Sequence, residues 1–192
     1  MTLGMDIIKA LTEKVYRQVP IIDYYAAVNI ILIPSNGVST ILIERTERKE
    51  DFWKGDIAFP GGRKIDNETD PAETALRETW EEIGVPKEKL EVLGYLKPIL
   101  SHLKFNVTVV PVVSLLKEKV KFRLNPREVS NIFIIPLDSL QHNFAFIDRV
   151  LIYTEAYTIP YTKKPIWGIT KRILDILLVL YKNTKEEKEI TN

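Results

Sequence analysis

The sequence contains no cysteine, only two histidines and two methionines, and almost no excess of charge of either sign. Without cysteine there is no disulfide framework, no thiolate nucleophile and no zinc-thiolate site, so any metal must use oxygen or imidazole ligands. Twenty-seven basic residues against 26 acidic ones give a formal net charge of +1, and this balance argues against extended nucleic-acid binding. No apolar run approaches the roughly 18 residues that a membrane-spanning helix needs.

The rest of the composition is that of an ordinary globular protein. The chain has 192 residues, of which 45% are hydrophobic and 28% are charged, and this size predicts a single domain over residues 1–192. The first residues mix Asp6 and Lys9 with apolar side chains, unlike a signal peptide. We therefore expect a cytoplasmic protein that does not enter a membrane.

Hydrophobic periodicity places most of the expected secondary structure. Residues 5–17 carry apolar side chains at three- and four-residue spacing, which predicts an amphipathic N-terminal helix. The same spacing predicts a last helix over 169–182, and the charged tail 183–192 is expected to fray because it has almost nothing apolar to bury. The segments typical of β-strands are 26–34, 40–45, 107–113, 119–122 and 132–135.

One turn and one helix have especially clear boundaries. Asn36-Gly37 lies between two β-rich runs and predicts a hairpin. Asp70, Pro71 and Glu73 predict a helix that begins with a capping box, and Gly84 predicts its C-terminal end. Strands and helices follow one another in mixed order, which favours an α+β fold.

Three carboxylates gather on one face of this central helix. Glu78, Glu81 and Glu82 lie at positions i, i+3 and i+4, where each like-charge pair destabilises a helix by about 0.2–0.5 kcal/mol. The C-terminal end of a helix also disfavours anions. Bound Mg²⁺ or Mn²⁺ would offset both penalties, because these ions prefer oxygen ligands. The alternative is a solvated acidic face, partly neutralised by Arg77 pairing with Glu73 or Glu81.

The residues around these glutamates form a longer pattern. Glu68 follows Gly62 after five intervening residues, and eight more precede the run Arg77-Glu78-Thr79-Trp80-Glu81-Glu82-Ile83-Gly84-Val85. The pattern resembles the box of the Nudix hydrolase family, G-x5-E-x7-R-E-U-x-E-E-x-G-U, in which U is a bulky aliphatic residue. This sequence departs from the box in two places, since one extra residue precedes Arg77 and Thr79 replaces the first bulky aliphatic residue.

The resemblance implies a Nudix-type α/β/α sandwich with a mixed β-sheet. It also implies an enzyme, a hydrolase that splits the diphosphate bond in a nucleoside diphosphate linked to another moiety. Glu78 and Glu82 would be direct ligands of Mg²⁺ or Mn²⁺. Glu81 would be a further ligand or would orient the attacking water, the main-chain carbonyl of Gly62 would complete a site, and Arg77 would hold the glutamates by ion pairing.

Two glutamates are candidates for the general base. Hydrolysis of a diphosphate needs a carboxylate that orients the attacking water or takes a proton from it. Glu82 within the box and Glu128 outside it both offer one. For Glu128, an ordinary surface acid ahead of a strand is an equally good interpretation. Glu68, the first acid of the box, is expected to brace the loop rather than bind metal.

Features outside the box resemble the coenzyme A pyrophosphatase branch of the family. The resemblance implies coenzyme A or acyl-CoA as substrate, with 3′,5′-ADP and a phosphopantetheine as products. The residues that carry it include Gly55-x3-Phe59-Pro60-Gly61-Gly62, Glu128-Val129, Pro136-Leu137 and Ile166-Trp167-Gly168-Ile169-Thr170.

The strand 41–45 departs from this branch, because it lacks the usual threonine and because Arg48 or Lys49 would have to replace a second arginine. Hydrolysis of ADP-ribose, NADH, FAD or dinucleoside polyphosphates on the same scaffold is therefore an alternative. A protein that binds a nucleotide without cleaving it is another.

Arg45, Phe59 and Gly61 are the candidate substrate-binding residues. Arg45 would meet a phosphate by charge, while Phe59 and Gly61 belong to the branch pattern. Four further aromatic residues could stack on adenine, although core or dimer packing is the simpler interpretation of each. We also expect a homodimer, since members of the family often pair, and the N-terminal helix would either join the interface or cap the core. The four aromatic residues are Trp53, Phe144, Phe146 and Tyr153.

Overall fold

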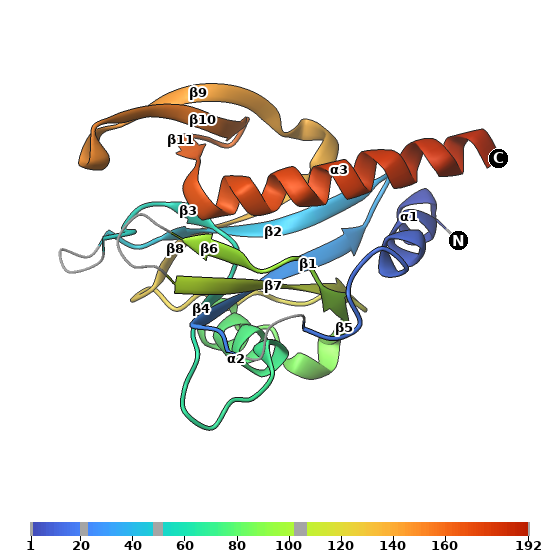
Figure 1. Cartoon of the computed structure of the whole chain (residues 1–192), viewed down its shortest axis with the longest axis horizontal. Helices are drawn as coiled ribbons and strands as arrows, with labels where there is room; N and C mark the ends of the chain where they lie inside the picture. The colour runs from blue at the N-terminus through green and yellow to red at the C-terminus, as the bar shows by residue number, and fades with distance from the viewer. Residues whose placement is uncertain (1, 20–22, 48–51, 102–106, 192) are drawn as a thin grey trace.

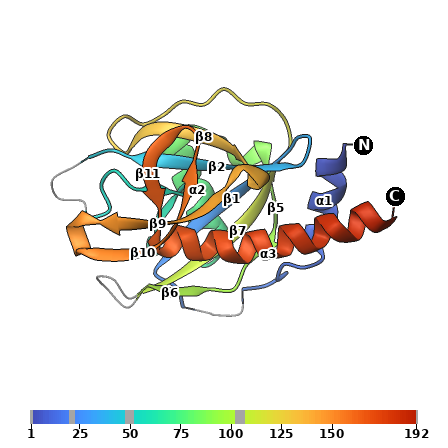
Figure 2. The same cartoon turned by 90° about the horizontal axis from the view of Figure 1, so that it is seen from above.

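The computed structural model describes residues 2–19, 23–47, 52–101 and 107–191. These residues form two β-sheets and three α-helices (Figures 1 and 2). The helices are α1 (Leu3–Thr12), α2 (Pro71–Ile83) and α3 (Gly168–Thr191), with short 3-10 turns η1 (Lys87–Lys89), η2 (Leu137–Ser139) and η3 (Asp148–Val150). The strands are β1 (Ala26–Pro34), β2 (Val38–Arg45), β3 (Ile57–Ala58), β4 (Gly61–Arg63), β5 (Leu90–Tyr95), β6 (Ile99–Ser101), β7 (Val107–Leu116), β8 (Val129–Pro136), β9 (Gln141–Ile147), β10 (Ile152–Ile159) and β11 (Thr162–Ile166).

The larger sheet is mixed, as expected. Its order is β3-β2-β1-β7-β5, with β4 beside β1, β6 beside β7 and β8 beside β2. Strands β1 and β7 run parallel, and the other pairs are antiparallel. Pro34 pairs with Val38, so the connection between β1 and β2 is the hairpin that Asn36-Gly37 predicts.

Helices cover both faces of this sheet, with α1 and α3 on one side and α2 on the other (Figure 1). Alternate residues of β1 build the two cores. Ile30 and Leu32 pack in one cluster with residues of α1 and α3, whereas Ile31 packs in another cluster with Ile83 of α2. All four side chains are fully buried, and burial of one such side chain stabilises a fold by about 1.5–3 kcal/mol. The expected α/β/α sandwich is therefore present.

The second sheet, in the order β11-β10-β9, packs against α3 outside the sandwich (Figures 1 and 2). Tyr157 of β10 donates a hydrogen bond to Asp175 of α3 at 2.9 Å, and Lys171 pairs with Glu155. These strands are not among those expected from the sequence, although Ile152–Ile159 is rich in the isoleucine, tyrosine and threonine that strands favour.

Two expectations near the sandwich are wrong. The N-terminal helix ends at Thr12 rather than at residue 17, because Tyr16 forms an isolated β-bridge with Tyr95. It packs against the sheet and α3 and so caps the core. Residues 119–122 form no strand. The chain that follows them runs along the end of α2 instead, where the Arg123 amide donates to the Ile83 carbonyl at 2.9 Å.

The expectation of a frayed tail over 183–192 is also wrong for the described residues. α3 continues to Thr191, as the helix at the C-terminal end in Figure 1 shows. Its charged residues find partners on distant elements, since Glu187 pairs with Lys14 at 2.7 Å and Lys185 pairs with Asp138 at 3.0 Å. Of the helices in the described part of the chain, none has both the length and the apolar character that a bilayer-spanning segment requires.

The ends of α2 agree with the sequence. Asp70 accepts a hydrogen bond from the Ala72 amide at 2.8 Å, and Glu73 accepts one from the Asp70 amide at 3.1 Å, which completes the capping box. Gly84 has a left-handed conformation with φ of 69° and ends the helix. Tyr95 of β5 also donates to Asp70 at 2.7 Å. The start of α2 is thus fixed both within the helix and against the sheet.

Replacing this cap tests its contribution to stability. Asp70→Ala removes the acceptor for the Ala72 amide and for the Tyr95 hydroxyl, and it should lower the free energy of unfolding by about 1–2 kcal/mol. Asp70→Asn keeps a capping oxygen and should stay close to the original stability. Urea denaturation of the three proteins measures the difference, and an alanine variant as stable as the asparagine variant would contradict the assignment.

Candidate functional site

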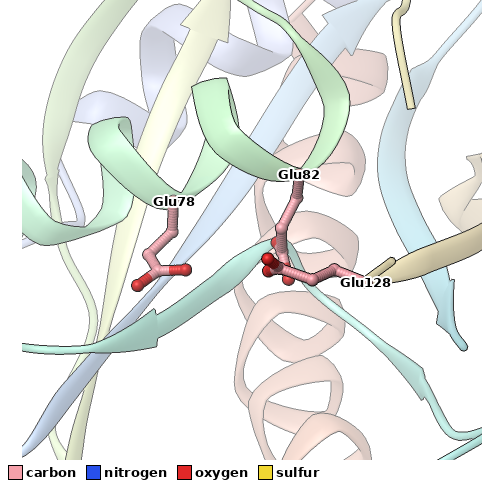
Figure 3. Close-up of side chains that lie close together, drawn as sticks. All are labelled: Glu78, Glu82 and Glu128. Atoms are coloured by element: carbon pink, nitrogen blue, oxygen red, sulfur yellow. The ribbon is translucent and has the colours of Figure 1, made fainter. Parts of the chain in front are cut away.

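Three carboxylates converge below α2. Glu78 and Glu82 project from one face of the helix, and Glu128 reaches toward Glu82 from the residue that precedes β8 (Figure 3). One ligand oxygen from each side chain lies within 4.8 Å of the other two. Glu78 and Glu82 are close in the sequence, and their spacing predicts that they share one helix face. Glu128 lies 46 residues beyond Glu82 and joins them only in the folded chain.

Backbone contacts with the end of α2 bring Glu128 to this position. The Asn125 amide donates to the Glu82 carbonyl at 2.9 Å, and the Glu128 amide donates to the Asn125 carbonyl at 2.9 Å. The Asn125 side chain then donates to Glu128 at 3.2 Å. The turn that ends at Glu128 is thus attached to the last turn of the helix that carries the other two acids.

Glu82 is the buried member of the cluster, with 1% of its surface exposed. The Gly61 amide donates to its Oε2 at 2.9 Å, and Nη1 of Arg45 lies 3.9 Å from its Oε1. The pKa of Glu82 is raised to about 8, mainly by burial and also by the nearby carboxylates of Glu78 and Glu128, while Gly61 and Arg45 oppose the rise. An added cation would favour the ionised form of this carboxylate.

The glycines of β4 allow α2 to approach the sheet closely. A Cβ atom on Gly62 would lie 2.4–2.5 Å from the carboxylate of Glu78, and one on Gly61 would lie 2.4 Å from the carbonyl oxygen of Ala27. Gly61 also has φ of 154°, which side chains rarely adopt. The approach leaves Glu78 partly buried, and burial raises its pKa above the usual range.

Arg77 connects the acids of the helix with the loop before it. Its guanidinium donates to Glu68 at 2.8 Å, to Glu78 at 2.7 Å and to Glu81 at 3.0 Å, and it also donates to the Arg63 carbonyl at 2.9 Å. Glu68 and Glu78 raise the pKa of Arg77 above its usual value, while burial opposes the rise. Of the two partners considered for Arg77 in a solvated acidic face, Glu81 is the one that it contacts.

Glu68 holds the loop between β4 and α2. It accepts hydrogen bonds from the Ile65 amide at 3.0 Å and from the hydroxyl of Thr74, in addition to Arg77. Those donors hold the pKa of Glu68 below its usual value although burial opposes the shift.

Thr79, the residue that departs from the box, is buried. Its hydroxyl accepts a hydrogen bond from the Asn29 side chain of β1 at 3.0 Å.

Glu81 lies apart from the three converged acids. Its side chain is 47% exposed and is bonded to Arg77, so its role as a ligand or as a group that orients water stays a prediction.

Three of the four aromatic residues considered for stacking, Phe144, Phe146 and Tyr153, lie exposed on the second sheet and do not border the cleft described next. The residues Arg48 and Lys49 fall outside the described part of the chain.

A cleft of about 240 Å³ opens beside the acid cluster. All of the candidate substrate-binding residues border it, namely Arg45, Phe59 and Gly61, and so does Gly62. Asp56 also lines the cleft, although it is not among the candidate residues expected from the sequence. No local pattern marks this residue, because its partners, described below, come from segments about 90 to 110 residues away.

The chain is similar to known proteins both in sequence and in fold. The NUDIX domain family model matches residues 23–154. The uncharacterized Nudix hydrolase NudL of Pectobacterium atrosepticum is 35% identical over 150 residues, which cover 75% of this chain and 77% of the relative.

Several solved structures are similar in fold, among them one from C. elegans and one from Shewanella oneidensis. An Ap4A hydrolase of C. elegans in a binary complex has a TM-score of 0.51 at 20% identity, covering 60% of this chain and 82% of that one. The NUDIX domain of Shewanella oneidensis NrtR, complexed with ADP ribose, has a TM-score of 0.50 at 15% identity, covering 85% and 88%.

The buried Glu82 makes stability depend on pH in the absence of divalent cations. Below the unfolded pKa of about 4.5 the side chain is protonated in both states. Between that value and about 8 only the unfolded chain releases the proton, so stability falls as pH rises. Glu82→Gln should remove this loss and exceed the original protein by about 3 kcal/mol in free energy of unfolding at pH 7.

Urea denaturation at several pH values between 4 and 8, in the presence of EDTA, measures this difference. The exposed Glu91 of β5 supplies the control, since Glu91→Gln should keep the original pH dependence. If Glu82→Gln also kept it, the assigned burial of an uncompensated carboxylate would be wrong.

Proposed function

This chain belongs to the Nudix hydrolase family, and we propose that it hydrolyses the diphosphate bond of a nucleoside diphosphate linked to another moiety. The observation that carries the proposal is the convergence of Glu78, Glu82 and Glu128 beside a cleft that Arg45 borders. Carboxylates supply the oxygen ligands that divalent cations prefer, and an arginine supplies hydrogen bonds for phosphate.

The residues fit Mg²⁺ or Mn²⁺. Glu82 is buried with two further carboxylates nearby and a cation, Arg45, no closer than 3.9 Å, so it is poorly neutralised by the protein itself. Glu78 and Glu82 would hold the metal, with the Gly62 carbonyl as a further ligand. When bound, the metal neutralises charge on the diphosphate and lowers the pKa of the attacking water.

Glu128 is the better placed of the two candidate bases. Both carboxylate oxygens of Glu82 already face partners, the Gly61 amide and the Arg45 guanidinium. Glu128 is less buried, and among the described residues its carboxylate accepts one hydrogen bond, from Asn125 to Oε1. We assign Glu128 as the residue that takes the proton of the attacking water, while Glu82 binds and Arg45 orients the phosphate.

Arg77 would orient the metal-binding glutamates rather than contact the substrate. It bonds Glu78 directly and connects it with Glu68 and with the Arg63 carbonyl beside Gly62. The glutamate is thereby held in one orientation against the glycines of β4. Glu81, which bonds the same guanidinium, completes the proposed set as a further ligand or as a group that orients water.

Coenzyme A or acyl-CoA is the substrate that we propose, on the resemblance of the segment 55–62 and the residues near 166–170 to that branch. Both segments border the cleft. ADP-ribose, NADH, FAD and dinucleoside polyphosphates are the alternative substrates. From the sequence alone we also propose one domain over 1–192, a homodimer and a cytoplasmic location.

Product identification tests the substrate. The purified protein, incubated with Mg²⁺ or Mn²⁺ and a panel of coenzyme A, ADP-ribose, NADH, FAD and diadenosine polyphosphates, should release 3′,5′-ADP from coenzyme A. Mass spectrometry identifies the products. Release of AMP from ADP-ribose, NADH or FAD instead would reject the branch but keep the reaction, and no cleavage of any compound would favour a nucleotide sensor.

Variants of the three acids test the assigned roles. Glu78→Gln and Glu82→Gln should each lower kcat/KM by about 100-fold or more and weaken Mn²⁺ binding, because an amide replaces an anionic ligand with little change in shape. Glu128→Gln should lower kcat by about 10²–10⁴-fold. Kinetics and Mn²⁺ titration measure both, with Glu91→Gln as the matched control. Near-original activity of Glu82→Gln would refute the metal role.

A further inference from the structure

Part of the cleft lining is a wall of aromatic side chains. Trp53 and Trp167 lie with ring centroids 6.2 Å apart and planes inclined by 45°, and both border the cleft together with Phe59. Sites for whole small ligands usually enclose about 300–1,000 Å³, whereas this cleft encloses about 240 Å³. It is therefore sized for one part of a larger substrate.

One carboxylate holds this wall together. Asp56 accepts a hydrogen bond from the indole nitrogen of Trp167 at 3.0 Å and another from the guanidinium of Arg149. Arg149 also donates to the Lys54 carbonyl at 3.0 Å. Its guanidinium carbon lies 5.0 Å from the ring centroid of Trp167 and 5.7 Å from that of Phe52, within the range of cation–π attraction.

These contacts join three segments that are distant in the sequence. Residues 52–59 lead into β4, Arg149 lies in η3 between β9 and β10, and Trp167 connects β11 with α3. Burial raises the pKa of Asp56, and its bonds with Arg149 and Trp167 oppose that rise. Removal of Arg149 would leave a largely buried carboxylate with fewer donors, and the segment 52–56 would lose its hydrogen bonds with η3.

We propose that the wall stacks against the planar base of the substrate and that Arg149 is the positioning residue that keeps Trp53 and Trp167 in place for it. The identity of the ligand as a nucleotide rests on the proposed function. Aromatic side chains bind any base through its π-face. A base against the tryptophans would leave its phosphates near Arg45 and Gly61, which border the same cleft and contact Glu82.

Calorimetric titration without metal tests the proposal through binding alone. AMP and ribose 5-phosphate differ by the base, so the ratio of their affinities isolates its contribution. The original protein should prefer AMP. Arg149→Gln should weaken AMP binding about tenfold and change ribose 5-phosphate binding less than twofold.

A matched control is Arg123→Gln, because Arg123 lies over the ring of Trp80 at 5.3 Å, a similar pair that does not border the cleft. It should leave both affinities unchanged. The proposal is overturned if Arg149→Gln binds AMP as the original protein does, if it weakens both ligands equally, or if the original protein does not prefer AMP.

A second variant covers the case in which Arg149→Gln does not fold. Trp167→Phe keeps an aromatic ring but removes the donor to Asp56. It should weaken AMP binding by about threefold without weakening ribose 5-phosphate binding, and an unchanged affinity for AMP would overturn the proposal.

With a cleavable nucleotide, Arg149→Gln should raise KM and leave kcat unchanged. Since the titrations need no turnover, an inactive protein that prefers AMP would reject the proposed function alone, and an active one with no AMP preference would reject this inference alone.

Discussion

The interaction on which the site depends is the burial of the Glu82 carboxylate among other acids. A buried carboxylate is costly unless it is neutralised or bound by a cation. Here the protein supplies one amide hydrogen bond, from Gly61, and one arginine at 3.9 Å, while Glu78 and Glu128 add negative charge. The fold therefore places three carboxyl groups at one point, an arrangement that suits the divalent cation of the proposed function.

Much of the surrounding structure serves to hold this unfavourable arrangement in place. The capping box and the Tyr95 hydroxyl fix the start of α2 at Asp70. Arg77 bonds three glutamates and the loop before the helix. The glycines of β4 let the helix lie against the sheet, so that Glu78 and Glu82 face inward rather than toward solvent. Stability in other parts of the fold thus offsets a local cost at the site.

The second sheet is connected through Arg149 to residues that border the cleft. It lies outside the sandwich, yet through Arg149 it contacts the loop that leads into β4. The loop and the start of α3 border the cleft together with Arg45, Gly61 and Gly62. In the proposed function, these residues would bind the substrate beside the acid cluster.

The sequence by itself determined the parts that depend on local chemistry. Asp70 and Gly84 mark the ends of α2 because capping involves residues within one turn, and the spacing of Glu78 and Glu82 places both on one helix face. Local information gave the wrong prediction for the tail 183–192, because its charged residues pair with residues on distant elements. Only the tertiary structure decided that Glu128 joins the acids while Glu81 stays half exposed. Contacts between segments that are far apart depend on packing, which a spacing pattern does not encode.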